Sequence, residues 1–168
     1  MKELTQEYLK SILHYDPDTG IFTWKNRDDV NKSWNTKYAN TIAGSLNNGY
    51  YQICINRSII KAHRLAFLYI IGRYPLFEVD HINSIKTDNK WKNLREATKS
   101  ENLQNLKKCR KDNKTGFLGV SFIPNRNKFT ANIEINQKQY YLGLFNTAQE
   151  AHESYLKAKR QLHPFGML

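Results

Sequence analysis

The stretch of residues 80–105 constrains the fold more than any other part of this chain. It begins at the end of a short predicted strand, and residues 83–92 follow as a polar loop. Residues 93–97 predict a second short extended segment. Thr98 and Glu101 then have the spacing of a capping box, which predicts the start of a helix. The pattern is therefore strand–loop–strand–helix, which places the tip of the first strand against the first turns of the helix.

The predicted helix continues to about Lys108 and carries two kinds of side chain. Leu103 and Leu106 lie on one side, where we expect them to pack. Asn102 and Asn105 are three residues apart and share another face. The strand tip and this asparagine face are therefore expected to be neighbours.

The charge of the chain indicates a polyanionic partner. The 168 residues carry a formal net charge of +11, which is not spread evenly. Residues 1–50 have six Lys/Arg and six Asp/Glu, residues 51–100 have nine and four, and residues 101–168 have eleven and five. With 12% aromatic residues beside this charge, nucleic acid is a better partner than the alternative, a basic surface that serves only solubility.

Two isolated cysteines, Cys54 and Cys109, have no spacing that fits a zinc knuckle or a disulfide framework. The first residues are amphipathic and charged, unlike a signal peptide, and the longest apolar run, residues 66–71, is too short to span a bilayer. We expect an intracellular, cytoplasmic protein without a membrane partner.

The N-terminal half predicts short elements separated by turns. Thr5 caps a helix to about His14, a turn follows, and residues 21–24 form a strand. Residues 26–41 are polar and are expected to be an irregular loop. A strand at residues 50–55 and a helix at residues 62–71 come next.

The C-terminal part predicts a small module of its own. Three short strands, at residues 119–123, 129–135 and 139–142, are separated by Asn-, Arg- and Lys-rich turns. Thr147 and Glu150 form a second capping box, which opens a helix to about residue 162.

The polar residues of the central stretch suit phosphodiester hydrolysis. His81 has the pKa of a general base for an attacking water. Asp80 and Asn102 supply oxygen ligands of the kind that Mg²⁺ prefers. Asn93 is placed to bond the loop backbone and to fix the base. Asp80 and His81 are adjacent, so they can work together only if the strand ends there and the chain bends.

These residues resemble the HNH (ββα-metal) endonuclease motif of phage and intron-associated homing-type nucleases, in the version where asparagine replaces the final histidine. The resemblance implies Asp80 and Asn102 as metal ligands, His81 as the base and Asn93 as the loop support. Asn105 is the alternative second ligand.

The segments LTQEYLK, YDPDTGIFTW, GYYQICI and AHRLAFLYIIGRYP are similar to the N-terminal half of such nucleases. Within them His63 is expected to be structural, and Arg64 is a candidate phosphate contact.

The C-terminal segments GVSFIPNRNKFTANIEI, YYLGLF and NTAQEAHESYLKA resemble the plant Apetala/ethylene-response-factor DNA-binding domain, which also occurs fused to phage HNH nucleases. In that family the three-stranded sheet enters the major groove. This sequence has polar side chains at positions where the plant family is rich in Arg and Trp. The alternative to DNA recognition is that this sheet face is simply exposed to solvent. The implied DNA-binding residues on and beside the sheet are Ser121, Ile123, Arg126, Lys128, Thr130, Asn132, Glu134, Gln139 and Tyr141. The basic connector before the sheet adds Lys107, Lys108, Arg110 and Lys111.

We therefore expect an α+β fold: a ββα-metal nuclease domain and a small three-stranded antiparallel sheet packed on one helix. The expected sections are residues 1–49 (N-terminal region integral to the nuclease part), 50–108 (HNH core), 109–114 (connector) and 115–168 (Apetala-like domain).

The expected function is that of a phage-encoded HNH endonuclease in a bacterial host. It would use Mg²⁺, with Mn²⁺ as a substitute, and leave 5′-phosphate and 3′-hydroxyl ends in double-stranded DNA. Two alternatives stay open, a DNA-binding regulator with a vestigial nuclease fold and a nuclease acting on RNA or structured nucleic acid. The sequence leaves undecided whether the protein nicks or cuts and whether it is a monomer or a homodimer.

Overall fold

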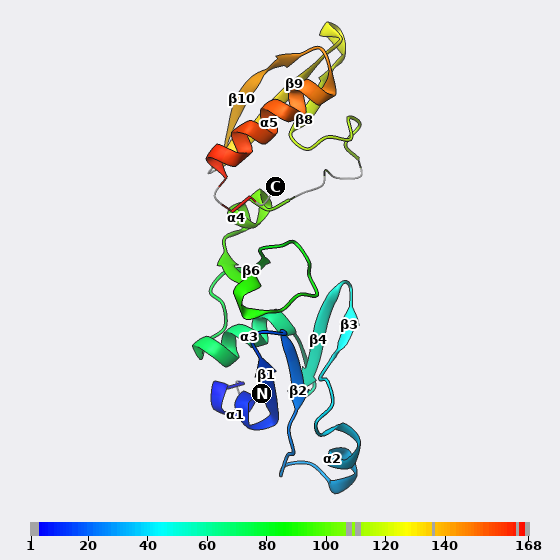
Figure 1. Cartoon of the computed structure of the whole chain (residues 1–168), viewed down its shortest axis with the longest axis vertical. Coiled ribbons are helices and arrows are strands. Elements are labelled where there is room, and N and C mark those ends of the chain that lie inside the picture. The colour runs from blue at the N-terminus through cyan, green and yellow to red at the C-terminus, as the bar shows by residue number, and fades with distance from the viewer. Residues whose placement is uncertain (1–3, 107–108, 110–111, 136, 164, 167–168) are drawn as a thin grey trace. The chain divides into compact units, whose positions relative to one another are not determined.

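The computed structural model of the protein describes residues 4–106, 109, 112–135, 137–163 and 165–166. The chain divides into two compact units, with the boundary between residues 96 and 97. Both units are mixed α+β with small antiparallel sheets (Figure 1). The four sections expected from the sequence stay a prediction.

The first unit alternates short helices with two- and three-stranded sheets (Figure 1). Its elements are α1 (Gln6–Ile12), β1 (Leu13–Asp16), β2 (Ile21–Trp24), α2 (Lys32–Tyr38), β3 (Ser45–Asn47), β4 (Tyr50–Ile55), β5 (Ser58–Lys61), α3 (Ala62–Ile71), β6 (Glu78–His81), the 3₁₀ helix η1 (Trp91–Asn93) and β7 (Leu94–Ala97), which reaches the boundary. Strands β1 and β2 form an antiparallel hairpin, β3, β4 and β5 form an antiparallel sheet, and β6 pairs with β7.

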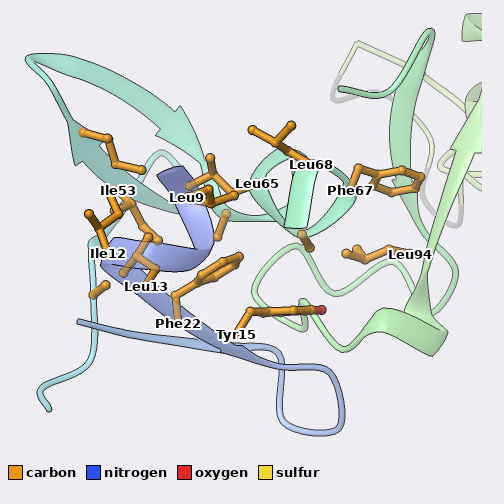
Figure 2. Close-up of a cluster of buried hydrophobic side chains, with 14 residues drawn as sticks. Leu9, Ile12, Leu13, Tyr15, Phe22, Ile53, Leu65, Phe67, Leu68 and Leu94 are labelled. Atoms are coloured by element: carbon orange, nitrogen blue, oxygen red, sulfur yellow. The ribbon is translucent and has the colours of Figure 1, made fainter. Parts of the chain in front are cut away.

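One hydrophobic core holds the first unit together (Figure 2). Leu9 from α1, Leu13 from β1, Ile53 from β4 and Leu65 from α3 are completely buried in it. The burial of four aliphatic side chains stabilises the fold by roughly 1.5–3 kcal/mol each. The core therefore fixes the hairpin and α3 to one another, and α3 begins directly after the strand β5.

Two sequence-based expectations for this region are wrong. The first helix ends at Ile12 rather than near His14, because the next residues pair with β2 as a strand. The polar stretch of residues 26–41 is not an irregular loop throughout, since it contains α2, which begins where the Asn31 side chain accepts a hydrogen bond from Trp34 N. The expected start of α1 at Thr5 is confirmed, because its hydroxyl accepts from Tyr8 N.

The second unit has the expected three-stranded antiparallel sheet packed on one helix. Its elements are α4 (Lys99–Gln104), β8 (Val120–Ile123), the 3₁₀ helix η2 (Pro124–Arg126), β9 (Lys128–Ile135), β10 (Lys138–Phe145) and α5 (Ala148–Leu162). The strand order is β10-β9-β8. Ala131 and Ile133 of β9 are buried in one cluster with Ala151 and Tyr155 of α5. Both predicted capping boxes, at the starts of α4 and α5, are confirmed.

The end of α4 differs from the expectation. The helix stops at Gln104, and Leu103 and Leu106, which were expected to pack, are 49% and 45% exposed. Lys159 of α5 is buried instead, and its Nζ donates a hydrogen bond to Leu106 O at 2.6 Å. The chain at the end of α4 is thus held by the hydrogen bond from the Lys159 side chain to the Leu106 carbonyl. Packing of Leu103 and Leu106 does not hold it. Within the described part of the chain, no helix is long and apolar enough to cross a membrane.

Candidate active site around His81

His81 stands at the end of strand β6, and the chain turns directly after it. Ser84 has a positive φ of 63°, and its N–H donates to His81 O at 2.7 Å. Ile82 N donates to Asn93 O at 2.9 Å, which ties the turn to the start of β7. Strand β6 therefore ends at His81 and the chain bends there. This bend is the condition under which the adjacent Asp80 and His81 are able to work together.

The His81 ring lies among buried polar and aromatic groups. Its Nε2 is 3.1 Å from Asn89 Oδ1, and the ring centroid of His63 is 5.1 Å away in an edge-to-face arrangement. Burial lowers the pKa of His81, against the opposing effects of the Asn89 hydrogen bond and the Asp80 charge. A histidine with a lowered pKa is neutral near pH 7, as a general base must be.

His63, at the start of α3, is held neutral even more strongly. Burial, followed by the charges of His81 and Lys61, lowers its pKa to about 3. Its ring also contacts Tyr50 edge-to-face, with centroids 5.3 Å apart. His63 is thus a buried, uncharged side chain that packs against the His81 ring.

Asn93 closes the loop that follows His81. Its Oδ1 accepts from Asn83 N at 2.9 Å, and its Nδ2 donates to Asp88 O at 2.7 Å and to Asn83 Oδ1 at 3.0 Å. Asn83 Nδ2 in turn donates to Asp88 Oδ2 at 2.7 Å. The side chain therefore bonds the loop backbone at both ends, while its contribution to catalysis stays a prediction.

The Asp80 carboxylate is buried and paired with a cation from the neighbouring strand. Its Oδ2 accepts from Arg95 Nε at 2.9 Å and from Arg95 Nη2 at 2.7 Å. Asp80 is 5% exposed, so this pair is largely shielded from water. Among the described residues, no cluster of three or more His, Cys, Asp or Glu side chains is suited to hold a metal.

Two lysines flank the aromatic ring beside the histidines. Lys61 Nζ is 4.3 Å and Lys86 Nζ is 5.0 Å from the centroid of the Tyr50 ring, which itself lies 6.2 Å from the His81 ring. Arg64, the candidate phosphate contact, stacks over Tyr74 at 5.9 Å. The candidate site is thus bordered by positive charge, which suits an anionic substrate.

The two candidate second ligands lie in the second unit. Asn102 is on α4, and Asn105 is the residue that ends this helix, with its N–H donating to Asn102 O at 3.2 Å. Asp80 belongs to the first unit. The pairing of either asparagine with Asp80 stays a prediction.

The residues expected to bind DNA from the sheet are in cross-strand register. The pairs are Ser121 with Thr130, Ile123 with Lys128, Asn132 with Tyr141, and Glu134 with Gln139. Directly paired residues share a face, and this face is opposite to Ala131 and Ile133, which pack on α5. Thr130 differs from most of the others because it is buried. Arg126 is exposed on η2, and the connector residues Lys107, Lys108, Arg110 and Lys111 lie outside the described residues.

Sequence reasoning missed several residues of this site, among them Tyr50, Lys61, Asn89 and Arg95. Asn89 is one of many loop asparagines, and only the fold shows that it meets His81. Arg95 lies in the predicted extended segment of residues 93–97, so an acidic and a basic residue on the two predicted strands were an available signal of an ion pair.

Residues 61–104 match the family model of HNH endonucleases. The matched segment contains His63, Arg64, Asp80, His81 and Asn93. It also contains Asn102, whereas Asn105 falls just outside it. The match supports an HNH nuclease domain in this segment and, through it, a nucleic-acid substrate. Searches of the curated proteins and of the solved structures found no significant match to the chain.

Proposed function

We propose that the protein is a metal-dependent HNH endonuclease of the phage homing type, which hydrolyses phosphodiester bonds in double-stranded DNA. The observation that carries the proposal is the match of residues 61–104 to HNH endonucleases, with a buried, neutral His81 inside that segment. The formal charge of +11 adds general support for a polyanionic substrate.

His81 acts as the general base in the proposed reaction. A water molecule attacks phosphorus in line with the leaving group and gives its proton to the imidazole. The new P–O bond forms as the bond between phosphorus and the 3′ oxygen breaks, and the 3′ oxygen takes up a proton from solvent. The products are a 5′-phosphate and a 3′-hydroxyl.

The donor chemistry of the site fits Mg²⁺, with Mn²⁺ as a substitute. Asp80 and Asn102 would hold the cation, with Asn105 as the alternative to Asn102. One carboxylate and one amide oxygen suit Mg²⁺, which keeps several waters and needs few protein ligands. When bound, the cation polarises the phosphate and stabilises the leaving oxygen. The buried charge of Asp80 is also balanced by Arg95.

The second unit and the connector are proposed to position the nuclease on duplex DNA. The face that carries Asn132, Glu134 and Gln139 offers amide and carboxylate groups, which are able to bond adenine and cytosine edges in the major groove. Arg64, Arg126 and the basic residues of the connector would contact phosphates.

The test is cleavage of supercoiled plasmid by the full chain and by His81→Ala, each with Mg²⁺ or with EDTA. We expect the wild type to nick or cut only with Mg²⁺, and the variant to keep DNA affinity but to lose cleavage. His14→Ala is the control, because His14 is an exposed histidine on β1. Undiminished cleavage by His81→Ala would overturn the assignment.

The same assay with RNA separates the two alternatives. Cleavage of RNA alone would indicate an RNA nuclease. Tight DNA binding without cleavage of either substrate would indicate a DNA-binding regulator.

A further inference from the structure

The imidazole of His81 has a fixed hydrogen-bond partner inside the first unit, the side chain of Asn89. His81 Nε2 and Asn89 Oδ1 are 3.1 Å apart, and the two residues are only 5% and 2% exposed. An amide oxygen accepts hydrogen bonds and cannot donate them. The neutral ring therefore meets it with the proton on Nε2, which leaves the ring lone pair on Nδ1. The opposite tautomer would set two acceptors against each other where water does not reach.

Asn89 is itself held through its backbone by the β1–β2 hairpin. The Tyr15 hydroxyl donates to Asn89 O at 2.7 Å, and burial raises the pKa of Tyr15, which keeps this donor protonated. Trp91 N donates to Pro17 O at 2.9 Å. Gly20 lies so close that a Cβ on it would be 2.4 Å from Asn89 C. The β1–β2 hairpin thus contacts the backbone of Asn89 and of the two residues that follow it, Lys90 and Trp91.

We propose that Asn89 is a positioning residue, which holds the His81 imidazole in the tautomer with its proton on Nε2 and its lone pair on Nδ1. The β1–β2 hairpin keeps Asn89 in place and so acts on His81 through it. Nδ1 is then the nitrogen that accepts the proton of the attacking water, a step that rests on the proposed function. This assigns a task to the N-terminal hairpin, which lies outside the segment matched to HNH endonucleases.

The first test measures the tautomer directly and needs no substitution at Asn89. The full chain, with its five histidines labelled with ¹⁵N, is studied by long-range ¹H–¹⁵N NMR above the ordinary pKa of histidine. The His81 signals are those that disappear in His81→Gln. We expect a protonated Nε2 and an unprotonated Nδ1. A proton on Nδ1 would overturn the proposal.

The second test compares Asn89→Leu, which removes the acceptor, with Asn89→Asp, which keeps an acceptor oxygen. We expect Asn89→Leu to populate the other tautomer and to slow single-turnover cleavage about 10- to 100-fold, as is typical when a partner that orients a metal-ligating histidine is lost. Its Kd for DNA should not change. Asn89→Asp should keep the tautomer and most of the rate. Thr87→Ala, an exposed position in the same loop, is the control.

The outcomes separate this inference from the proposed function. A folded Asn89→Leu protein with unchanged tautomer and unchanged cleavage would refute the positioning by Asn89. A wild type that cleaves neither DNA nor RNA would refute the nuclease, while its NMR spectrum would still test the Asn89 contact. If Asn89→Leu does not fold, the wild-type tautomer and the Asn89→Asp variant decide.

Discussion

The residues around His81 differ in how far sequence alone determines them. Asp80, His81 and Asn93 were predicted as site residues from the sequence, because the resemblance to a family motif assigns a role to each. Asn89 and Arg95 were not, because their importance comes from partners that only the fold brings to them. Arg95 also affects the proposed metal site, because its guanidinium places a positive charge beside the Asp80 carboxylate, which is proposed to bind the metal.

The variant Arg95→Gln tests this charge balance. Without the guanidinium, the buried Asp80 carboxylate loses its paired cation, so the free energy of unfolding in EDTA should fall by about 3 kcal/mol. Mg²⁺ should restore more stability to this variant than to the wild type, because ligand binding to the folded state is linked to its stability. Urea denaturation with and without Mg²⁺ measures both effects.

Arg73→Gln is the matched control for that experiment. Arg73 also pairs with a carboxylate, that of Glu96, but this guanidinium is 44% exposed. An exposed pair contributes little, so its loss should have a small effect that does not depend on Mg²⁺. Equal behaviour of the two variants would contradict the link between Arg95 and the metal.

At the scale of elements, the sequence predicted those that have strong local signals. Residues close together in the chain determine the capping boxes of α4 and α5 and the turns between β8, β9 and β10. The structure contains all of these elements. The helix α2 was missed because it is polar and has no buried side chain to create a periodic pattern. The contact between the β1–β2 turn and the loop at Asn89 was beyond prediction, since it joins segments far apart in the chain.

Gly20→Ala tests that contact. Gly20 has a φ of +76°, and a Cβ there would be 2.4 Å from the backbone of both Asn89 and Lys90. The left-handed conformation alone costs an alanine roughly 1–2 kcal/mol, and the clash adds to this. We expect a lower Tm and slower cleavage, because the displaced loop carries Asn89.

The control is Gly49→Ala in the same unit. Gly49 has a φ of +79°, but the nearest atom to its Cβ would be a lysine side-chain carbon at 3.8 Å. This variant has the same backbone cost without the clash. If both variants lose equal stability and Gly20→Ala keeps its cleavage rate, the hairpin does not act on the site.

At the scale of the whole molecule, we propose different functions for the two units, hydrolysis around His81 in the first and DNA binding by the sheet in the second. The first unit carries the base and its supports, and the second carries a sheet whose face opposite α5 is free of the helix. Substitutions on this sheet face should therefore change DNA affinity without changing the chemistry, because the proposed metal ligand Asn102 lies on α4 and not on the sheet. The charge of the sequence does not mark this division, because the positive excess begins in residues 51–100, most of which belong to the first unit.

The double variant Arg126→Ala/Lys128→Ala tests the division in the second unit. If both side chains contact phosphates, DNA binding should weaken, and the slope of log K against log salt should become shallower by about 1–2. Cleavage of DNA at saturating protein should keep its wild-type rate, because His81 and its partners are untouched. Lys157→Ala/Arg160→Ala removes the same charge from exposed positions of α5, the helix that covers the opposite face of the sheet. An equal loss of affinity in this control would mean that net charge, rather than the sheet face, determines binding.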